Sequence, residues 1–332
     1  MNLVTGATGL LGTHMLIELL QRQEKVRALK RADSNTNMVL SVFKFYKAEQ
    51  LFEKIEWVEG DVLDADSLLS AMTDCDHVYH CAAVVSYHKA DRQLMYKVNV
   101  EGTANVVNAA IEMKTKKLCF VSSIAALGKV KDGDVLNEQN EWKDSDYNTH
   151  YGITKHLSEL EVWRGVQEGL NAIVVNPGFI IGPGDASRSS ASVFRKLNEG
   201  LAYYPPGGTG FVAATDCSKM MVDLTTSEVH NERFILVAEN LSMKYLFQKV
   251  AVALGKKSPE KSANNFIIHW VRMAEWMKEK LTGQKALITR ESARNTSVRF
   301  YYENEKVKRR LQVEFRKIDN AIQQTAEFFK SK

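Results

Sequence analysis

Two side chains that can exchange a proton, Tyr151 and Lys155, lie four residues apart in a stretch expected to be helical. This spacing places both on one face of a helix, about one turn apart. A free tyrosine has a pKa of ~10 and is a poor acid or base in neutral solution, but a neighbouring ammonium lowers that pKa. The pair is therefore suited to proton exchange with a substrate oxygen, although the same pattern also arises by chance.

Two serines, Ser122 and Ser123, follow an expected strand at residues 118–121. In doubly wound sheets, ligands bind at the carboxyl ends of the strands. Ser123 would then donate a hydrogen bond to the substrate oxygen on which charge develops. Such a group suits hydride transfer between a nicotinamide cofactor and a carbonyl, although two serines at a strand end are unremarkable by themselves.

A glycine-rich segment at residues 6–12, GATGLLG, lies between a short apolar run and an apolar helical pattern. Glycines at this spacing let backbone N–H groups approach a phosphate at the start of a helix. The spacing differs from the commoner G-x-G-x-x-G fingerprint, and alone it also fits an ordinary turn between a strand and a helix. We expect it to hold a dinucleotide through Gly6, Thr8, Gly9, Leu10, Leu11 and Gly12.

The elements that must position these groups alternate along the first half of the chain. Continuous apolar runs, typical of strands buried on both faces, are separated by helical patterns. This alternation predicts an α/β fold with a doubly wound parallel Rossmann sheet. Strands are expected at residues 2–5, 26–29, 55–59, 77–81, 118–121 and 172–175, and helices at 10–20, 67–72, 91–111 and 151–167.

After Pro177 the pattern changes, because prolines and glycines gather up to residue 210 and helical patterns follow. We expect a smaller, mostly helical C-terminal substrate lobe. The expected division is 1–176 plus about 211–237 for the cofactor domain, and about 177–210 plus 238–332 for the lobe. The amphipathic stretch 266–281 is expected to pack on its own domain; a membrane-surface helix and a lid over an apolar substrate are the alternatives.

The composition excludes several classes of protein. Of the 332 residues, 45% are hydrophobic and 25% charged, and the net charge of +4 comes without basic clusters, which argues against a nucleic-acid partner. The four cysteines have no metal-ligand spacing, so we expect no metal site and a reducing, cytoplasmic location. We expect no membrane span and, with five residues before Gly6, no signal peptide.

Further motifs point to a family. They are TGATGLLG at 5–12, GDVLD at 60–64, HCAA at 80–83, NVEGTANVVNAA at 99–110, VSSIAALG at 121–128, YGITK at 151–155 and NPGFIIGPGD at 176–185. With them the chain resembles the extended short-chain dehydrogenase/reductase superfamily, or NAD-dependent epimerase/dehydratase family, and within it the dihydroflavonol reductases and 3β-hydroxysteroid dehydrogenases. The motifs are much less specific for a substrate.

The resemblance implies roles for individual residues. Ser123, Tyr151 and Lys155 would be catalytic, and Tyr151 and Lys155 would also contact the cofactor, Lys155 at the nicotinamide ribose. Asn99 matches the family's helix asparagine, with a catalytic, water-holding or structural role. The other implied cofactor contacts are Asp61 and Val62 at the adenine, Cys81, Ala82 and Ala83 past the fourth strand, and Pro177 and Ile180 at the nicotinamide.

The end of the second strand bears on the choice of cofactor. NAD-specific sites usually place an acidic residue there to bind the ribose hydroxyls. Here the strand ends in Lys30 and Arg31, and no acid appears before Asp33. Lys30 and Arg31 would bind a 2′-phosphate through charge-assisted hydrogen bonds, unless they are ordinary surface residues. We expect NADP(H) to be preferred, with NAD(H) possible.

The residues after Ser123 narrow the reaction. Sugar dehydratases of the family carry an Asp-Glu pair there, whereas this chain has Ile124-Ala125-Ala126, and the aromatic residue usual in epimerases near residue 127 is absent. We expect reduction of a ketone or aldehyde, or oxidation of a secondary alcohol, in an apolar or aromatic small molecule. The predicted substrate contacts are Val85, Tyr87, Ile124 and Phe179.

The sequence leaves two alternative functions undecided, an epimerase and a cofactor sensor, and it also leaves the oligomeric state undecided. A nucleotide-sugar epimerase would need groups for a diphosphate; no arginine pair is obviously placed for one, and Arg188 and Arg195 are the candidates. A non-catalytic NADP-binding sensor would keep the fold alone. The resemblance also implies a homodimer formed by the helices at 91–111 and 151–167. Their apolar residues lie on more than one face, which burial against the sheet would also produce.

Overall fold

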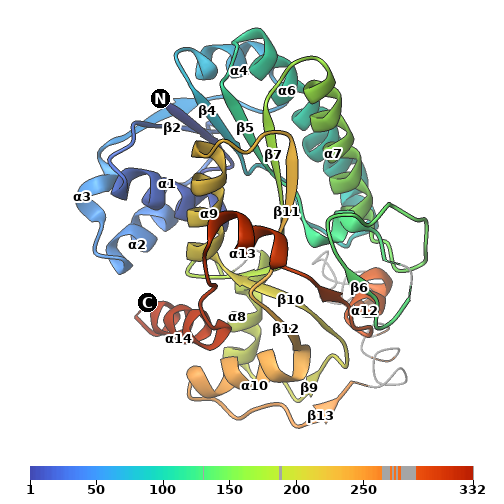
Figure 1. The fold of residues 1–332 in the computed structure, drawn as a ribbon. Helices are drawn as coiled ribbons and strands as arrows, with labels where there is room; N and C mark the ends of the chain where they lie inside the picture. The colour runs from blue at the N-terminus through green and yellow to red at the C-terminus, as the bar shows by residue number, and fades with distance from the viewer. Residues whose placement is uncertain are drawn as a thin grey trace.

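A seven-stranded parallel β-sheet lies at the centre of the protein in a computed structural model (Figure 1). Its order, β11-β7-β5-β4-β1-β2-β3, runs outward in both directions from the β1–β4 pair. This confirms the expected Rossmann-type α/β fold, with its ligand-binding crevice predicted where the order reverses. The strands are β1 (Asn2–Thr5), β2 (Val26–Lys30), β3 (Ile55–Glu59), β4 (His77–His80), β5 (Lys117–Val121), β7 (Ala172–Pro177) and β11 (Glu232–Leu236).

The structure describes residues 1–129, 131–186, 189–263 and 289–331, together with 270, 273, 276 and 277. Arg188 and most of the amphipathic stretch at 266–281 lie outside the described residues. Among those described, no helix is both long and apolar enough to cross a membrane. Nor do three or more His, Cys, Asp or Glu side chains of the described residues gather as a metal site requires.

Helices cover both faces of the sheet (Figure 1). On one face α1 packs against α9, beside α2 and α3; on the other α6 lies between α4 and α7. Their bounds are α1 (Leu10–Gln21), α2 (Asn37–Phe45), α3 (Glu49–Phe52), α4 (Ala65–Met72), α6 (Gly102–Glu112), α7 (His150–Gln167) and α9 (Ala214–Thr226).

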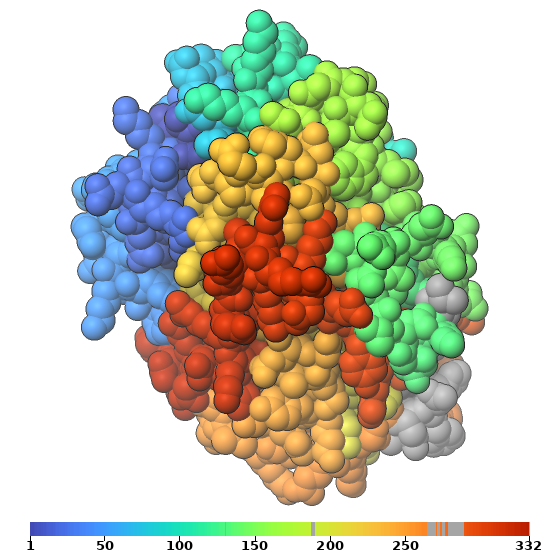
Figure 2. Space-filling view, viewed as in Figure 1, coloured from blue at the N-terminus to red at the C-terminus, as the bar shows by residue number. Residues whose placement is uncertain are grey.

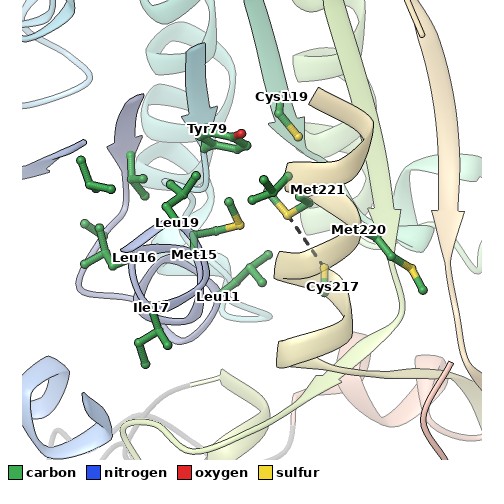
Figure 3. Close-up of a cluster of buried hydrophobic side chains, with 14 of the residues drawn as sticks. Leu11, Met15, Leu16, Ile17, Leu19, Tyr79, Cys119, Cys217, Met220 and Met221 are labelled. Atoms are coloured by element: carbon green, nitrogen blue, oxygen red, sulfur yellow. Dashed lines mark hydrogen bonds between the residues drawn. The ribbon is translucent and has the colours of Figure 1, made fainter. Parts of the chain in front are cut away.

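The contact between α1 and α9 fixes the position of the helix that follows the glycine turn. Figure 3 shows Met15 of α1 near Met221 of α9, with Tyr79 and Cys119 of the sheet beside them. All four side chains are fully buried. Burying one large apolar side chain contributes about 1.5–3 kcal/mol, so this cluster holds α1 firmly against the sheet. The four cysteines of the chain are all free thiols.

The expected helix at 91–111 is continuous but not uniform. It consists of η1 (Lys89–Asp91), α5 (Arg92–Met95), a π-helical stretch η2 (Tyr96–Glu101) and α6. π-helical turns inside α-helices occur frequently at functional sites. Here the π-helical stretch carries Asn99, which the sequence singles out.

A second layer contains a small sheet that the sequence pattern did not predict. β10 (Gly208–Ala213) runs parallel to β8 (Phe179–Ile181) and antiparallel to β12 (Glu239–Ser242). Three helices share its core, α8 (Ser192–Glu199), α10 (Met243–Ala253) and α14 (Ile318–Lys330). The chain returns to the large sheet through α9 and β11 before it completes this layer.

The C-terminal residues connect the two layers. In Figure 2 they lie, in red, between the large-sheet region and the orange segment around α10. β14 pairs with β6, which follows β5 in the large sheet. The remaining elements are β6 (Val135–Leu136), β9 (Tyr203–Tyr204), β13 (Lys261–Ser262), β14 (Tyr301–Tyr302), η3 (Ile124–Leu127), η4 (Ser189–Ala191), α12 (Arg290–Asn295) and α13 (Glu305–Leu311).

Candidate active site

The glycine turn passes directly against the end of β4. Gly6 has a φ of +64°, and a Cβ built there would lie 2.6 Å from the backbone nitrogen of Ala82. A Cβ on Gly12 would lie 2.2 Å from the carbonyl oxygen of Gly6. Gly9 precedes α1 as its N-cap and has no side chain to cap it. The first-turn N–H groups of α1 therefore remain suitable partners for an anion.

Ser123 and Tyr151 lie in the region where η3 and α7 pack against each other. Ser123 is the N-cap of η3, and its Oγ accepts a hydrogen bond from Ala125 N at 3.1 Å. Burial, and secondly Tyr87, raise the pKa of Tyr151, while a hydrogen bond between the Ser123 and Tyr151 side chains acts in the opposite direction. The expected lowering of the Tyr151 pKa by Lys155 is therefore wrong for this structure, because burial outweighs the opposing effect, and the tyrosine is neutral and keeps the proton that it could donate.

Close packing aligns the start of α7 with the residues after Ser123. Thr149 caps the helix, because its Oγ1 accepts a hydrogen bond from Gly152 N at 3.0 Å. A Cβ on Gly152 would lie only 2.7 Å from Ala125 O, so glycine allows the two segments to approach this closely. Tyr151, beside Gly152, is thereby placed at the end of β5.

Lys155 lies one turn further along α7 and is 1% exposed. Its Nζ lies 4.2 Å from the centroid of the Phe120 ring, a cation–π geometry. Burial lowers the pKa of Lys155 to about 7, against the opposing effects of Glu159 and Cys81. The protonation of Lys155 is therefore sensitive to its neighbours near neutral pH.

Asn99 uses its whole side-chain amide to connect two segments. Its Nδ2 donates to Val84 O and to Thr154 Oγ1, both at 3.0 Å, and its Oδ1 accepts from Val84 N at 2.7 Å. The loop after β4 is thus tied to the residue that precedes Lys155. This geometry suits a positioning role, and a catalytic role for Asn99 stays a prediction.

The residues predicted at the adenine follow the carboxyl end of β3, and some of their hydrogen-bonding atoms already bind other groups of the protein. Asp61 Oδ1 accepts a hydrogen bond from Leu63 N at 2.9 Å, and Val62 is buried with its carbonyl bound to Asn105. At the end of the neighbouring strand β2, Lys30 Nζ lies 3.4 Å from Glu59 Oε1 of β3. Arg31 Nε lies 3.3 Å from Asp33 Oδ1.

The residues predicted along the cofactor past the fourth strand follow β4, and those predicted at the nicotinamide lie in β7 and β8. Burial raises the pKa of the Cys81 thiol, with Lys155 acting in the opposite direction, so Cys81 lies near Lys155 and is neutral. Ala82 N donates to Thr5 Oγ1 at 3.3 Å, and Ala83 follows in the same loop. Pro177 ends β7, and Ile180 lies in β8.

The four predicted substrate residues have different surroundings in the structure. Tyr87 lies beside Tyr151, whose pKa it influences. Val85 is 48% exposed. Ile124 follows Ser123 but belongs to a small buried cluster, and Phe179 packs edge-on against Phe211 at 5.5 Å between ring centroids. Tyr87 is therefore the member of this set with a direct link to the predicted catalytic group.

The helix α12, from the C-terminal part of the chain, contacts the start of α7. The sequence analysis did not predict this contact. In α12, Glu291 Oε1 accepts a hydrogen bond from His150 N, the first residue of α7, at 2.6 Å. Asn295 Oδ1 accepts from Lys129 Nζ at 2.9 Å, and burial lowers the pKa of Lys129 to about 8. No local pattern in the sequence connects α12 with residues so distant in the chain.

Sequence reasoning also missed Glu159, a carboxylate one turn beyond Lys155. It is 2% exposed and accepts hydrogen bonds from Ser122 Oγ and, at 2.6 Å, from Asn176 Nδ2. Arg233 lies 3.5 Å away on β11. The available signal was its spacing, because it repeats the four-residue step from Tyr151 to Lys155.

Residues 2–236 match the model of the NAD dependent epimerase/dehydratase family. The chain belongs to this family. The match covers every strand of the large sheet, from β1 through the end of β11, and thus all the predicted catalytic residues.

Individual relatives extend the similarity into the C-terminal region. A Synechocystis protein provisionally named dihydroflavonol 4-reductase is 25% identical over 338 residues, covering 99% of this chain and 94% of that protein. Sterol demethylase protein B of Methylococcus capsulatus is 30% identical over 261 residues, covering 77% and 75%. The crystal structure of gox2253 superposes with a TM-score of 0.82 at 26% identity and covers 99% of this chain and 98% of that chain.

The NAD dependent epimerase/dehydratase family implies a dinucleotide cofactor, and the residues present fit one. At Gly6 and Gly12 a side chain would collide with backbone, so the turn has the open, tight shape that a pyrophosphate needs. α1 begins there without a side-chain cap, which leaves its N-terminus to an anion. This family of enzymes is NAD-dependent, and reductases are among the relatives.

Proposed function

We propose that the protein reduces a ketone or aldehyde, or oxidises the corresponding alcohol, with Ser123, Tyr151 and Lys155 as its catalytic residues. The observations that carry the proposal are the close approach of Gly152, beside Tyr151, to Ala125, two residues after Ser123, and the burial of Lys155 one turn further along α7. A proton donor, an oxyanion donor and a cation then converge near the carboxyl ends of the strands that form the cofactor crevice.

Each of the three side chains has a separate task. Ser123 Oγ donates a hydrogen bond to the carbonyl oxygen of the substrate, where negative charge develops. Tyr151 donates its phenolic proton to that oxygen, and the Lys155 ammonium stabilises the phenolate that remains. A nicotinamide cofactor, when bound, would supply the hydride for the carbonyl carbon. In the reverse direction, Tyr151 takes the proton from the alcohol.

We propose that the glycine turn holds the pyrophosphate and that the remaining contacts are those implied by the family motifs. The contacts at the turn are Gly6, Thr8, Gly9, Leu10, Leu11 and Gly12. Those along the rest of the cofactor are Asp61, Val62, Cys81, Ala82, Ala83, Tyr151, Lys155, Pro177 and Ile180. The preference for NADP(H) over NAD(H) is assigned to Lys30 and Arg31, whose acidic partners would give way to a 2′-phosphate.

We propose an apolar or aromatic carbonyl compound as the substrate, bound by the lobe at about 177–210 and 238–332. Relatives whose names refer to a dihydroflavonol and a sterol support this class. Tyr87, Val85, Ile124 and Phe179 are the proposed contacts. Arg195 pairs with Glu199 at 3.2 Å on the surface, and such a pair would not prevent it from binding a sugar diphosphate, so the epimerase stays the alternative.

We also propose a homodimer formed by the helices at 91–111 and 151–167, which comprise α5, η2, α6 and α7. Three large hydrophobic side chains of these elements are about half exposed: Leu94 at 50%, Tyr96 at 47% and Leu160 at 50%. A second copy that packs against them would remove this apolar surface from water. Light scattering should give twice the monomer mass, and Leu160→Glu should shift it towards the monomer; a wild-type monomer would contradict the proposal.

A turnover assay tests the proposed reaction. Wild-type protein is incubated with NADPH or NADH and a panel of apolar and aromatic ketones and aldehydes, and loss of reduced cofactor is followed. Tyr151→Phe should lower kcat by about 10²–10⁴-fold, the usual contribution of a general acid. Tyr147→Phe, the same substitution four residues upstream, is the matched control and should keep its activity. Cofactor binding without turnover by the wild type across the panel would favour the sensor instead.

A further inference from the structure

A buried carboxylate lies behind the proposed catalytic lysine. Glu159 follows Lys155 by four residues on α7, so the two side chains share one helix face. Glu159 is 2% exposed. Burying a carboxylate costs several kcal/mol unless cations and hydrogen-bond donors surround it. The partners of Glu159 must therefore offset this cost.

The partners of Glu159 come from three neighbouring strands. Ser122 Oγ, at the end of β5, donates to Oε1, and Asn176 Nδ2 of β7 donates to the same oxygen at 2.6 Å. Arg233 of β11 lies 3.5 Å from Oε2. Asn176 Nδ2 also donates to the carbonyl oxygen of Ser123 at 2.9 Å. Glu159 thus links the catalytic helix to the backbone of Ser123.

Glu159 also differs in charge from the other groups that face Lys155. His80 and Cys81 at the end of β4 interact with Lys155 electrostatically. Burial lowers the pKa of His80 to about 3 and raises the pKa of the Cys81 thiol, so both groups are neutral. Arg233 is a second cation on the far side of Glu159. Among these groups, Glu159 is the one able to offset the charge of Lys155.

Burial raises the pKa of Glu159 itself, while Arg233, Ser122, Asn176 and Lys155 act in the opposite direction. Every one of these four partners is a cation or can donate a hydrogen bond to the carboxylate. We therefore assign the ionised form to Glu159 at neutral pH.

We propose that Glu159 is a positioning residue of the reductase site, whose carboxylate keeps Lys155 protonated and orients Ser123 through Asn176. The inference rests on the proposed function, since it assigns the ammonium of Lys155 a task in proton donation by Tyr151. Glu159 touches neither substrate nor cofactor in this role. It sets the pH range in which the catalytic group works.

The test compares pH profiles of kcat for carbonyl reduction in wild type and Glu159→Gln. The amide keeps the shape and one acceptor oxygen but loses the charge. Reduction should fall as pH rises and Lys155 loses its proton. Without Glu159 the pKa of Lys155 is lower, so this alkaline limb should move to lower pH by about one unit or more. Glu161→Gln, on the same helix but paired with Arg164, is the matched control and should leave the limb in place.

A second readout separates this inference from the proposed function. NMR titration of isotope-labelled lysine side chains, with the Lys155 signal assigned from Lys155→Met, measures its ionisation without any turnover. The midpoint should be lower in Glu159→Gln even if no substrate of the panel is reduced, in which case only the proposed function fails. If Glu159→Gln does not fold, Glu159→Asp, which withdraws the carboxylate, should shift the midpoint less but in the same direction. An unchanged midpoint in the folded variant would overturn the inference.

Discussion

Two basic sites lie at the carboxyl edge of the same sheet and differ in almost every physical respect. Lys155, near the ends of β4 and β5, is 1% exposed and has a buried carboxylate one turn away. Lys30 and Arg31, at the end of β2, have side chains that are 19% and 58% exposed and pair with surface acids. The packed interior surrounds Lys155, whereas Arg31 is largely exposed and Lys30 is partly buried beside an exposed acid.

This difference indicates how the two sites can change. In the interior, a charge interacts strongly with its neighbours, and each partner is needed because leaving a buried charge unpaired is costly. At the surface, an ion pair contributes about 0–1 kcal/mol and exchanges partners easily. Substitutions in the buried site should therefore abolish chemistry, whereas those at the exposed edge should retune the choice of cofactor.

The largest effect should come from removing the buried ammonium. Lys155→Met keeps the length of the side chain but loses the charge, so kcat for carbonyl reduction should fall by about 10²–10⁴-fold. Lys30→Met makes the same exchange at the exposed edge and should leave kcat with NADH nearly unchanged. Equal losses of NADH-dependent kcat in the two variants would break the comparison between the sites.

A second buried base should make the fold sensitive to acid. Burial lowers the pKa of His14, on α1 beside the glycine turn, to about 4, whereas the unfolded chain binds the proton at its ordinary pKa near 6.5. The native state therefore binds fewer protons, and stability should fall as pH drops from about 6.5 to 4, by on the order of 3 kcal/mol.

Urea unfolding at several pH values between these limits measures that loss. His14→Asn should remove this contribution to the dependence of the unfolding free energy on pH, while that of the buried His80, whose pKa burial also lowers, stays. The exposed His230→Asn should preserve the whole dependence. If both variants keep the wild-type slope, acid sensitivity does not originate at His14.

A smaller loss should follow a change in the glycine turn. In Gly12→Ala the new methyl group meets the Gly6 carbonyl, so the free energy of unfolding should drop by about 1–3 kcal/mol and NADPH binding should weaken. Gly169 has a φ of +102° and no atom within 4 Å of a built Cβ. Gly169→Ala should add backbone strain alone and leave cofactor binding intact. Calorimetry measures the NADPH affinity of Gly12→Ala and Gly169→Ala. Equal affinities would show that the turn tolerates a side chain.

The smallest effect is expected at the exposed edge. Arg31→Ala should weaken NADPH binding by about tenfold, equivalent to about 1.4 kcal/mol, and should change NADH binding little. Asp33→Asn removes the acidic partner of Arg31 and should strengthen NADPH binding. Fluorescence titration with both cofactors measures the preference. If Arg31→Ala weakens NADH binding equally, Arg31 does not select the 2′-phosphate.

Much of the first half of the chain was predictable because its signals are local. A strand buried on both faces needs consecutive apolar residues, and a tight turn against β4 needs glycine at residue 6. The pattern around 91–111 predicted a helix but not its π-helical stretch, since one extra residue in a turn leaves little trace in periodicity. The three-stranded sheet of β8, β10 and β12 escaped prediction because its short strands lie far apart in the chain.

By itself the sequence determined the Rossmann sheet, the glycine turn and the four-residue step from Tyr151 to Lys155, all of which depend on neighbours within a few residues. Only the tertiary structure decided what surrounds them: Asn176 and Arg233 against Glu159, and Glu291 of α12 at the start of α7. The reason is physical. The cost of burying a charge depends on groups brought together by folding, and no periodicity records which distant residues will meet it.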